Sequence, residues 1–414
     1  MAATRSTAVA MRPAAETVEP AATAAVTAVT RRAALALVAL ACLAGTAVVP
    51  AAPGDLLVYF GTYTGGASKG IYVSRLNPAT GTLTTPQLAA ETPSPSFLAV
   101  RAQGDFLYAV NEVDTFQGKA EGSVSAFAIR KDSGMLTPLN QAGSGGPGPA
   151  HLSLDRGGRA VLVANYGGGS VAVLPIGADG RVGVKSSFVQ HTGSSVNPDR
   201  QREPHAHQIL TDPSNRFAYV ADLGIDKVMI YRFDAATGAL TAASPASAAV
   251  KAGAGPRHLA ISGSGRFAYV IDELDCTITA FRRDPSNGAL TELQNVSTLP
   301  PGQAVQRGYS TAEIAIHPTG AFLYGSNRGH DSISVFAIDK ASGRLTYVSN
   351  TPTAGKTPRG FGIEPGGGYL LAGNQNSDSV VVFKIDRATG KLTATGTTVT
   401  VGAPVDIKFV SSKQ

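Results

Sequence analysis

The stretch Asp386-Arg-Ala-Thr-Gly-Lys-Leu-Thr393 decides the fold, because similar phrases recur along the whole chain. The other copies occupy residues 77–84, 131–137, 177–182, 234–241, 284–291 and 339–346. Their glycines stand at positions 81, 134, 180, 238, 288, 343 and 390, so neighbouring copies lie 46 to 58 residues apart. A period near fifty residues is typical of a repeat architecture in which each unit is one small supersecondary structure.

One repeat contains the signals of four short strands. His258-Leu-Ala-Ile261 alternates, Arg266-Phe-Ala-Tyr-Val-Ile271 is rich in β-formers, and Thr277-Ile-Thr-Ala-Phe281 alternates again. Gly263-Ser-Gly265 and Asn287-Gly288 supply turns, and Ala-Leu-Thr291 begins the last strand. A four-stranded sheet cannot bury its own faces, but seven such sheets packed around an axis bury each other. We therefore predict an all-β fold, a seven-bladed β-propeller.

The two ends of the repeat region are expected to share one blade. The first copy opens with Leu57-Val-Tyr-Phe60, which matches the second strand of the other repeats, and no innermost strand precedes it. Pro404-Val-Asp-Ile-Lys-Phe-Val410, after the last copy, matches the innermost strand Pro256-Arg-His-Leu-Ala-Ile261. We therefore expect the N- and C-terminal strands to close the ring, and residues 53–414 to form one propeller domain.

Composition excludes several classes of protein. The chain has 414 residues, is 43% hydrophobic and only 15% charged, which does not suit disorder. Its net charge is +6, but residues 1–52 hold four Arg against two Glu, and the remaining Lys and Arg are scattered. Nucleic-acid binding needs a basic face, so none is predicted. Of the two cysteines, Cys42 lies in the leader, so Cys276 has no disulfide partner.

Residues 1–52 read as an export leader. Arg31 and Arg32 precede an apolar run that ends at Val49, and small residues follow it, which is the layout of a signal peptide. The paired arginines indicate the twin-arginine pathway, so a periplasmic or extracellular location is expected. Cys42 would suit a lipid anchor, but the apolar run before it is short. No later stretch is long and apolar enough to span a membrane.

Chemistry is expected at one end of the channel, where the innermost strands begin and the second strands end; we call this end the mouth. The innermost strands begin with Ser96 and Phe97, Ala150 and His151, His207 and Gln208, Arg257 and His258, Ala312 and Glu313, Arg359 and Gly360, and Val405 and Asp406. The second strands end with Asn111 and Glu112, Asn165 and Tyr166, Asp222 and Leu223, Asp272 and Glu273, Asn327 and Arg328, and Asn374 and Gln375.

Much of this pattern also has a purely structural interpretation. The Asn or Asp that ends each second strand is interpreted as a turn former that bonds its own backbone, and polar residues in a channel also keep it wet. A residue that differs from blade to blade is harder to explain by architecture. His207, Arg257, Glu273 and Arg328 are such departures, and we predict that they are catalytic. His151, His258, Glu112 and Arg359 share the mouth and are predicted to bind substrate.

The sequence resembles the lactonase family of seven-bladed propellers, which includes 6-phosphogluconolactonases and carboxy-cis,cis-muconate cyclases. The resemblance covers roughly residues 56 to 411 and rests on these motifs: Gly61-Thr-Tyr-Thr64, Leu107-Tyr-Ala-Val-Asn-Glu112, Gly148-Pro-Ala-His151, Pro204-His-Ala-His-Gln208, Gly255-Pro-Arg-His258 and Ser326-Asn-Arg-Gly-His330. Resemblance to the cyclase branch of the family implies that one His, two Arg and one Glu in the channel mouth do the chemistry. In this sequence the family pattern places them at His207, Arg257, Arg328 and Glu273.

The resemblance implies a lactonase that opens a sugar lactone, with or without a phosphate, by attack of water. His207, or Glu273 beside it, would take the proton, and Arg257 and Arg328 would bind anionic groups. We expect a small anionic lactone as substrate and a monomer or dimer. There is no H-E-x-x-H or paired-Cys motif, so no cofactor or metal is predicted. Two alternatives stay open: a muconate-type lactonizing cycloisomerase, and a non-enzymatic exported propeller that binds a protein or polysaccharide.

Overall fold

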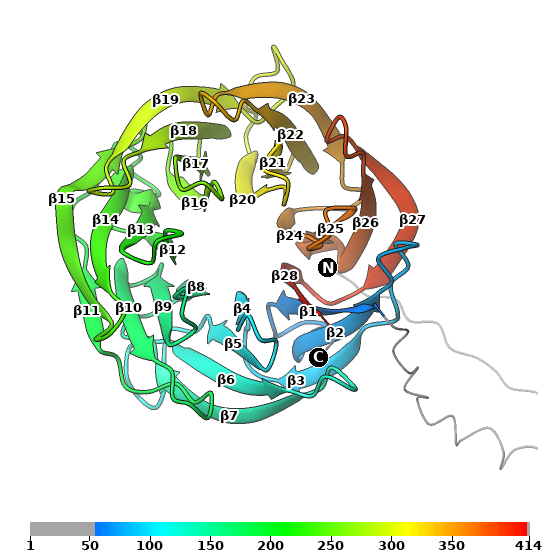
Figure 1. The fold of residues 1–414 in the computed structure, drawn as a ribbon, viewed down its shortest axis with the longest axis horizontal. Helices are drawn as coiled ribbons and strands as arrows, with labels where there is room; N and C mark the ends of the chain where they lie inside the picture. Colours follow the sequence, from blue (N-terminus) through cyan, green and yellow to red (C-terminus); the bar gives the residue numbers. More distant parts are fainter. Residues whose placement is uncertain (1–53, 412–414) are drawn as a thin grey trace, which may run out of the picture. The chain divides into compact units, whose positions relative to one another are not determined.

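The computed structural model describes residues 54–411, which form seven four-stranded antiparallel sheets around a common axis (Figure 1). The innermost strands are β28 (Pro404–Ser411), β4 (Leu98–Val100), β8 (Pro149–Leu154), β12 (Ala206–Thr211), β16 (Pro256–Ile261), β20 (Ser310–Ile316) and β24 (Pro358–Ile363). The second strands are β1 (Leu56–Thr62), β5 (Phe106–Asn111), β9 (Ala160–Asn165), β13 (Phe217–Asp222), β17 (Phe267–Asp272), β21 (Phe322–Arg328) and β25 (Tyr369–Asn374). The predicted seven-bladed propeller is confirmed.

The outer half of each blade contains the remaining strands. The third strands are β2 (Gly70–Leu76), β6 (Ser123–Ile129), β10 (Ser170–Pro175), β14 (Lys227–Asp234), β18 (Thr277–Arg283), β22 (Ser332–Ile338) and β26 (Ser379–Ile385). The outermost strands are β3 (Gln87–Glu91), β7 (Leu136–Gly143), β11 (Ser187–Gln190), β15 (Ala239–Ala249), β19 (Leu290–Ser297), β23 (Leu345–Pro352) and β27 (Leu392–Thr400). Two short 3₁₀ turns, η1 (Leu223–Ile225) and η2 (Gln375–Ser377), follow β13 and β25. We number the blades 1 to 7 in chain order, from the one containing β1.

Blade 1 is built from both ends of the described chain. β28 pairs antiparallel with β1, from Leu56 opposite Ser411 to Thr62 opposite Pro404, and β2 and β3 complete the sheet. Figure 1 shows β28 on the inner side of β1, which confirms the predicted closure. The predicted leader, residues 1–52, lies outside the described residues. Within residues 54–411, no helix is long and apolar enough to cross a membrane.

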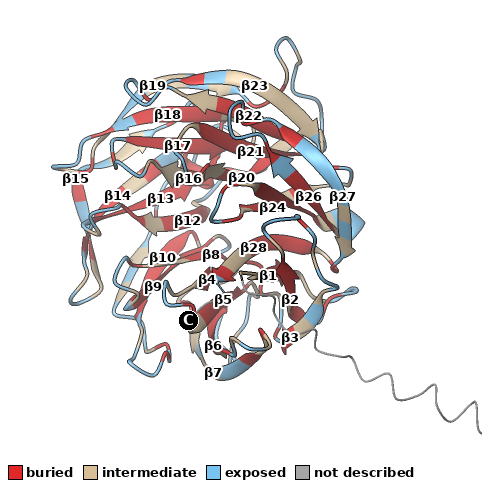
Figure 2. Ribbon diagram, turned by 45° about the vertical axis from the view of Figure 1, so that its right-hand side comes forward, coloured by how far each residue is buried: buried red, intermediate tan, exposed pale blue. Residues whose placement is uncertain are grey.

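Burial follows the position of a strand within its blade. The second strands are covered on both faces by neighbouring blades, so β9 and β13 are buried at every residue. The outermost strands alternate or are largely exposed, as in β15 and β27, and Figure 2 shows this change from red inside to blue outside. This explains why the second strands read as continuous apolar runs.

The repeated glycine phrase is the contact between neighbouring blades. Gly343 has φ +75°, which favours glycine, and an added Cβ would lie 2.2 Å from the ring of Phe267 in the preceding blade. The hydroxyl of Tyr269 donates to the carbonyl of Gly343 at 3.1 Å. Equivalent Tyr-to-Gly bonds join Tyr59 to Gly134, Tyr108 to Gly180, Tyr219 to Gly288, and Tyr324 to Gly390. These five copies of the phrase therefore dock on the second strand of the blade before them.

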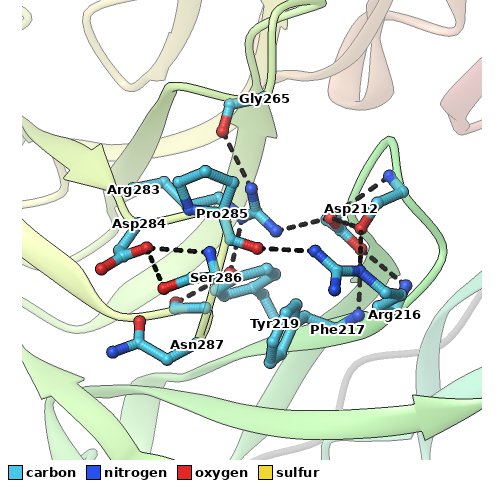
Figure 3. Close-up of polar contacts among 12 residues, drawn as sticks. Asp212, Arg216, Phe217, Tyr219, Gly265, Arg283, Asp284, Pro285, Ser286 and Asn287 are labelled. Atoms are coloured by element: carbon cyan, nitrogen blue, oxygen red, sulfur yellow. Dashed lines mark hydrogen bonds and ion pairs between the residues drawn. The ribbon is translucent and has the colours of Figure 1, made fainter.

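The junction between blades 4 and 5 adds a buried ion pair to this contact (Figure 3). Arg283 of β18 pairs with Asp212, donates from Nη1 to the carbonyl of Gly265 at 3.0 Å, and donates from Nε to the hydroxyl of Tyr219 at 2.7 Å. The same hydroxyl donates to the carbonyl of Gly288 at 2.8 Å. Tyr219 therefore serves two partners, whereas Tyr324 serves only the carbonyl of Gly390.

We expect Tyr219→Phe to lower the free energy of unfolding by about 2 kcal/mol and Tyr324→Phe by about 1 kcal/mol. Both variants leave a buried carbonyl without its donor, but only Tyr219→Phe also removes an acceptor from a buried guanidinium. Denaturant titration of the two variants measures the difference. Equal losses would contradict a role for the Arg283 contact at this junction.

Candidate active site at the channel mouth

A β-bulge at the start of the innermost strand positions the side chains of the mouth. In blade 5, Pro256 pairs with Asp272 and His258 pairs with Ile271, so Arg257 has no partner in the ladder. Bulges bend a strand and redirect side chains. Here the result is that two consecutive residues lie together, because Arg257 Nη1 donates to His258 Nε2 at 3.4 Å. The same shift leaves Ala150, His207, Arg359 and Val405 unpaired in other blades.

Glu273, which follows β17, is the anchor of an arginine cluster. Its Oε2 lies 3.1 Å from Arg257 Nε and 3.0 Å from Arg328 Nη2, and its Oε1 lies 2.7 Å from Arg200 Nη2. Burial alone would raise the pKa of Glu273, but the guanidiniums of Arg328, Arg257 and Arg200 outweigh it and lower the pKa to about 2. The carboxylate is therefore ionised at neutral pH and both of its oxygens are occupied.

Arg257 is held in place by more than this ion pair. Its Nη1 also donates to the carbonyl of Ala312 at 2.7 Å, and its side chain is only 3% exposed. Burial, together with the nearby charges of Arg359 and Arg328, lowers the pKa of Arg257 to about 9, so the guanidinium stays protonated at neutral pH. A buried and fixed positive charge thus faces the mouth.

A second polar chain runs along the other side of the mouth. Arg359 Nη2 donates to the hydroxyl of Tyr63 at 2.8 Å, and that hydroxyl donates to Glu112 Oε2 at 2.8 Å. Ser96 also bonds Glu112 Oε2. Burial raises the pKa of Tyr63, so its phenol remains a donor. The single hydroxyl of Tyr63 therefore links Arg359 to Glu112.

Three histidines pack between the two groups. The ring of His258 lies 5.0 Å from that of His207 and 5.4 Å from that of His151, measured between centroids. Burial lowers the pKa of all three well below the usual 6.5, and nearby positive charges add to the effect. His258 Nδ1 contacts Glu313 Oε1 at 3.1 Å, whereas Nδ1 of His151 and of His207 has no hydrogen-bond partner among residues 54–411. The three rings are therefore neutral at pH 7.

The channel contains two cavities. A small one at the mouth is lined by Tyr63, Ser96, Phe97, Glu112, Ala150, Arg257, His258, Glu313, Arg359 and Val405. A larger one, of about 680 Å³, opens toward the opposite end and is lined mainly by apolar residues of β4, β8, β20, β24 and β28. Phe97 and Glu313 line both cavities. Arg257 and Arg359 line the small cavity, whereas the charged residues that line only the larger one are Asp155, Arg156 and Lys408.

The structure brings the eight predicted site residues into one cluster at the mouth. Arg257 links the Glu273–Arg328 pair to His258, and His258 lies between His207 and His151. Arg359 and Glu112 line the same small cavity as Arg257. The cluster is a structural finding; the role of each residue within it is a proposal. Among residues 54–411, no group of three or more His, Cys, Asp or Glu is placed to hold a metal ion.

Sequence reasoning assigned no role to two polar residues of the mouth. Tyr63 directly follows β1, as Glu112 directly follows β5, so it belongs to the same set of strand-end residues. That set was compared for six blades only, which is why Tyr63 was not recognised. Arg200 lies in the segment between β11 and β12. Because this segment has no counterpart in the repeat, aligning the blades could not find it.

The Asn and Asp residues that end the second strands do not act mainly as turn formers, contrary to the prediction. They were interpreted as turn formers that bond their own backbone, but Asn111, Asn165, Asn327 and Asn374 are fully buried and bond other segments. Asn111 Nδ2 donates to Thr92 and Pro93, in the connection that leads into β4. Asp222 alone of the six also bonds its own turn, at Gly224. Asp272 bonds Thr277 and Thr279 of its own blade. The other five tie the second strand to the connection between blades, whose buried backbone groups need partners.

Residues 57–409 match the family model described as Lactonase, 7-bladed beta-propeller. The 6-phosphogluconolactonase of Bacillus subtilis is 38% identical over 305 residues, which cover 73% of this chain and 83% of the relative. A 6-phosphogluconolactonase of Formosa agariphila is 33% identical and covers 70% of this chain and 81% of its own.

Solved structures agree with these relatives. A putative 6-phosphogluconolactonase of Bacteroides fragilis superposes with a TM-score of 0.79 at 37% identity, covering 86% of this chain and 98% of its own. A structure described as the periplasmic gluconolactonase PpgL of Pseudomonas aeruginosa has a TM-score of 0.81 at 36% identity, covering 87% of this chain and 100% of its own.

Proposed function

We propose that this chain, which belongs to the Lactonase family of seven-bladed β-propellers, opens its substrate at the mouth of the channel. It is a lactone hydrolase that resembles 6-phosphogluconolactonase. We place the active site at the mouth because Glu273, its arginines and the neutral His207 cluster there. This cluster combines a candidate general base with fixed positive charge.

His207 is the better general base of the two candidates. A general base needs a free lone pair that can reach the proton it removes. Glu273 has a pKa of about 2, and Arg200, Arg257 and Arg328 occupy both of its oxygens. His207 is neutral, and its buried Nδ1 has no hydrogen-bond partner within the described chain. We therefore assign proton removal to His207 and the orientation of the arginines to Glu273.

The reaction then follows ordinary acyl chemistry. Water attacks the lactone carbonyl carbon and gives a proton to His207, while Arg257 and Arg328 stabilise the negative charge that develops on the carbonyl oxygen. The bond between the carbonyl carbon and the ring oxygen breaks, and the ring oxygen takes the proton back from His207. The product is an open hydroxy acid. His151, His258, Glu112 and Arg359 bind the ring and its substituents.

A panel of lactones tests this function with the purified full chain. We expect turnover of aldonolactones, phosphorylated or plain, measured as acid release at constant pH, and no lactone formation from a muconate. Preference for the muconate substrates would instead favour the cycloisomerase. Absence of turnover across the whole panel would overturn the proposal. Buffers without phosphate are needed, because the mouth is rich in arginine.

Export is proposed separately. Residues 1–52 carry Arg31 and Arg32 before an apolar run, and the Pseudomonas aeruginosa structure is described as periplasmic. We expect cell fractionation to find the chain outside the cytoplasm. Replacing Arg31 and Arg32 with Lys should retain it inside, because the twin-arginine pathway reads this pair. Unchanged export of that variant would exclude this pathway.

A further inference from the structure

Arg200 stands apart from the other arginines of the mouth because it does not belong to a blade. It lies in the segment 191–205, which connects β11 to β12. The backbone of this segment folds on itself, since Ser195 N donates to Gln201 O and Gln201 N donates to Asn197 O. Sequence repetition gives no reason for an arginine here.

The segment is fastened to blade 4 next to Arg200. Gln201 is fully buried, and its Nε2 donates to Leu223 O and to Asp226 Oδ1, each at 2.8 Å. The hydroxyl of Ser195 also bonds Asp226. Because the residue after Arg200 is anchored in this way, Arg200 is presented to the mouth from a fixed backbone position.

The guanidinium of Arg200 is only partly used within the protein. Its Nη2 donates to Glu273 Oε1 at 2.7 Å and to the hydroxyl of Tyr166 at 3.0 Å. Nε and Nη1 have no hydrogen-bond partner among residues 54–411, and the side chain is 40% exposed. By contrast, Arg257 is 3% exposed and Arg328 is 14% exposed. Arg200 is therefore the solvent-facing arginine of the three that bind Glu273.

The charges of the mouth leave room for an anion. The guanidiniums of Arg200, Arg257, Arg328 and Arg359 face the carboxylates of Glu273 and Glu112. The histidines are neutral because burial lowers their pKa, and burial raises the pKa of Glu313. Positive charge is thus in excess. A guanidinium with unused N–H donors binds phosphate or carboxylate through charge-assisted hydrogen bonds.

We propose that Arg200 is a specificity-determining residue that binds an anionic substituent of the lactone, a phosphate or a carboxylate, distant from the reacting carbonyl. It does so through Nη1, while Nη2 keeps its bonds to Glu273 and Tyr166. The excess positive charge at the rim thereby selects charged lactones over neutral ones. This inference rests on the proposed function of the mouth.

The test compares Arg200→Gln with Arg202→Gln in the full chain. Arg202 is exposed on the same segment and bonds only the carbonyl of Pro198, so it is a matched control. The substrates are 6-phosphoglucono-δ-lactone, a lactone that carries a carboxylate, and neutral glucono-δ-lactone. We expect Arg200→Gln to lower kcat/KM for one or both charged lactones by about 30-fold, mainly through KM, because one charge-assisted contact is lost.

The selectivity ratio decides the outcome. The preference for the charged lactone over the neutral one should shrink about tenfold in Arg200→Gln and stay unchanged in Arg202→Gln, and added salt should reduce the preference of the parent protein. Whichever charged lactone loses more activity in Arg200→Gln, the phosphorylated one or the one with a carboxylate, identifies the group that Arg200 binds. An equal fall on charged and neutral lactones would overturn the proposal, since Arg200 would then act only through Glu273. No fall would overturn it as well.

Calorimetry separates this proposal from the proposed function. If the parent protein hydrolyses no lactone, the function fails, but binding of 6-phosphogluconate, of a dicarboxylate sugar acid and of gluconate to the full chain still tests Arg200. Weaker binding of a charged acid to Arg200→Gln, relative to gluconate, would support the role. Equal binding to both proteins would exclude it.

Discussion

His207→Ala is expected to lower kcat/KM for lactone hydrolysis by about 10² to 10⁴, the range for loss of a general base. The ring lies 5.0 Å from that of His258 and 5.2 Å from that of Tyr166, so its removal leaves the ion pairs of Glu273 in place. The fold should therefore persist, which circular dichroism checks. His330→Ala is a suitable control, because His330 bonds Ser332 and packs on Tyr309, outside the histidine group.

The pH profile separates a base from a residue that only fills space. The neutral form of His207 is the active one, and burial holds its pKa well below 6.5. Activity should therefore persist below pH 6.5 and decline only as the pH falls through that lowered pKa. In His207→Ala this acid decline should disappear from the remaining activity. A neutral lactone avoids titration of the substrate. A decline centred above pH 6.5, or one that survives in His207→Ala, would contradict the assignment.

The fold was predictable because its determinants are local and repeated. Position 343 requires glycine, because its φ is +75° and its backbone packs against the ring of Phe267 in the preceding blade. Its carbonyl also accepts a hydrogen bond from Tyr269 of that blade. The same demand recurs at nearly every junction, so it leaves a periodic trace in the sequence. Blades 3 and 7 are the exceptions: Leu162 and Leu371 stand where the other five blades have Tyr, and Gly238 packs on Ser186 and Val173 instead.

The candidate site was predictable only where it uses blade positions. Arg257 and His258 lie together because of a bulge at a repeated place, so alignment of the blades finds both. Arg200 reaches Glu273 from a connecting segment, and no periodic signal leads to it. The roles of Asn111 and its equivalents were misread for a related reason. Their partners lie in the connections between blades, whose paths the sequence does not specify.

Glu273→Gln is expected to lower the free energy of unfolding by about 3 kcal/mol, because removal of one partner leaves buried charges without compensation. Arg257 and Arg328 are mostly buried and both bind Oε2, so a neutral amide leaves two positive charges beside each other. The lowered pKa gives a similar size independently: a change from 4.5 to about 2 corresponds to about 3 kcal/mol at neutral pH. Lactone hydrolysis should fall too, because Arg257 and Arg328 lose their anchor.

The pH dependence of stability tests this account against simple loss of packing. The pKa of Glu273 is lower in the folded state than in the unfolded chain, so its stabilising effect is present above about pH 4.5 and is lost as the pH falls toward 2. The difference in unfolding free energy between the parent and Glu273→Gln should therefore shrink over that interval. Glu292→Gln, exposed on β19 of the same blade, should show no such convergence. A difference that stays constant with pH would mean that the amide disturbs packing and that the charge of Glu273 contributes little.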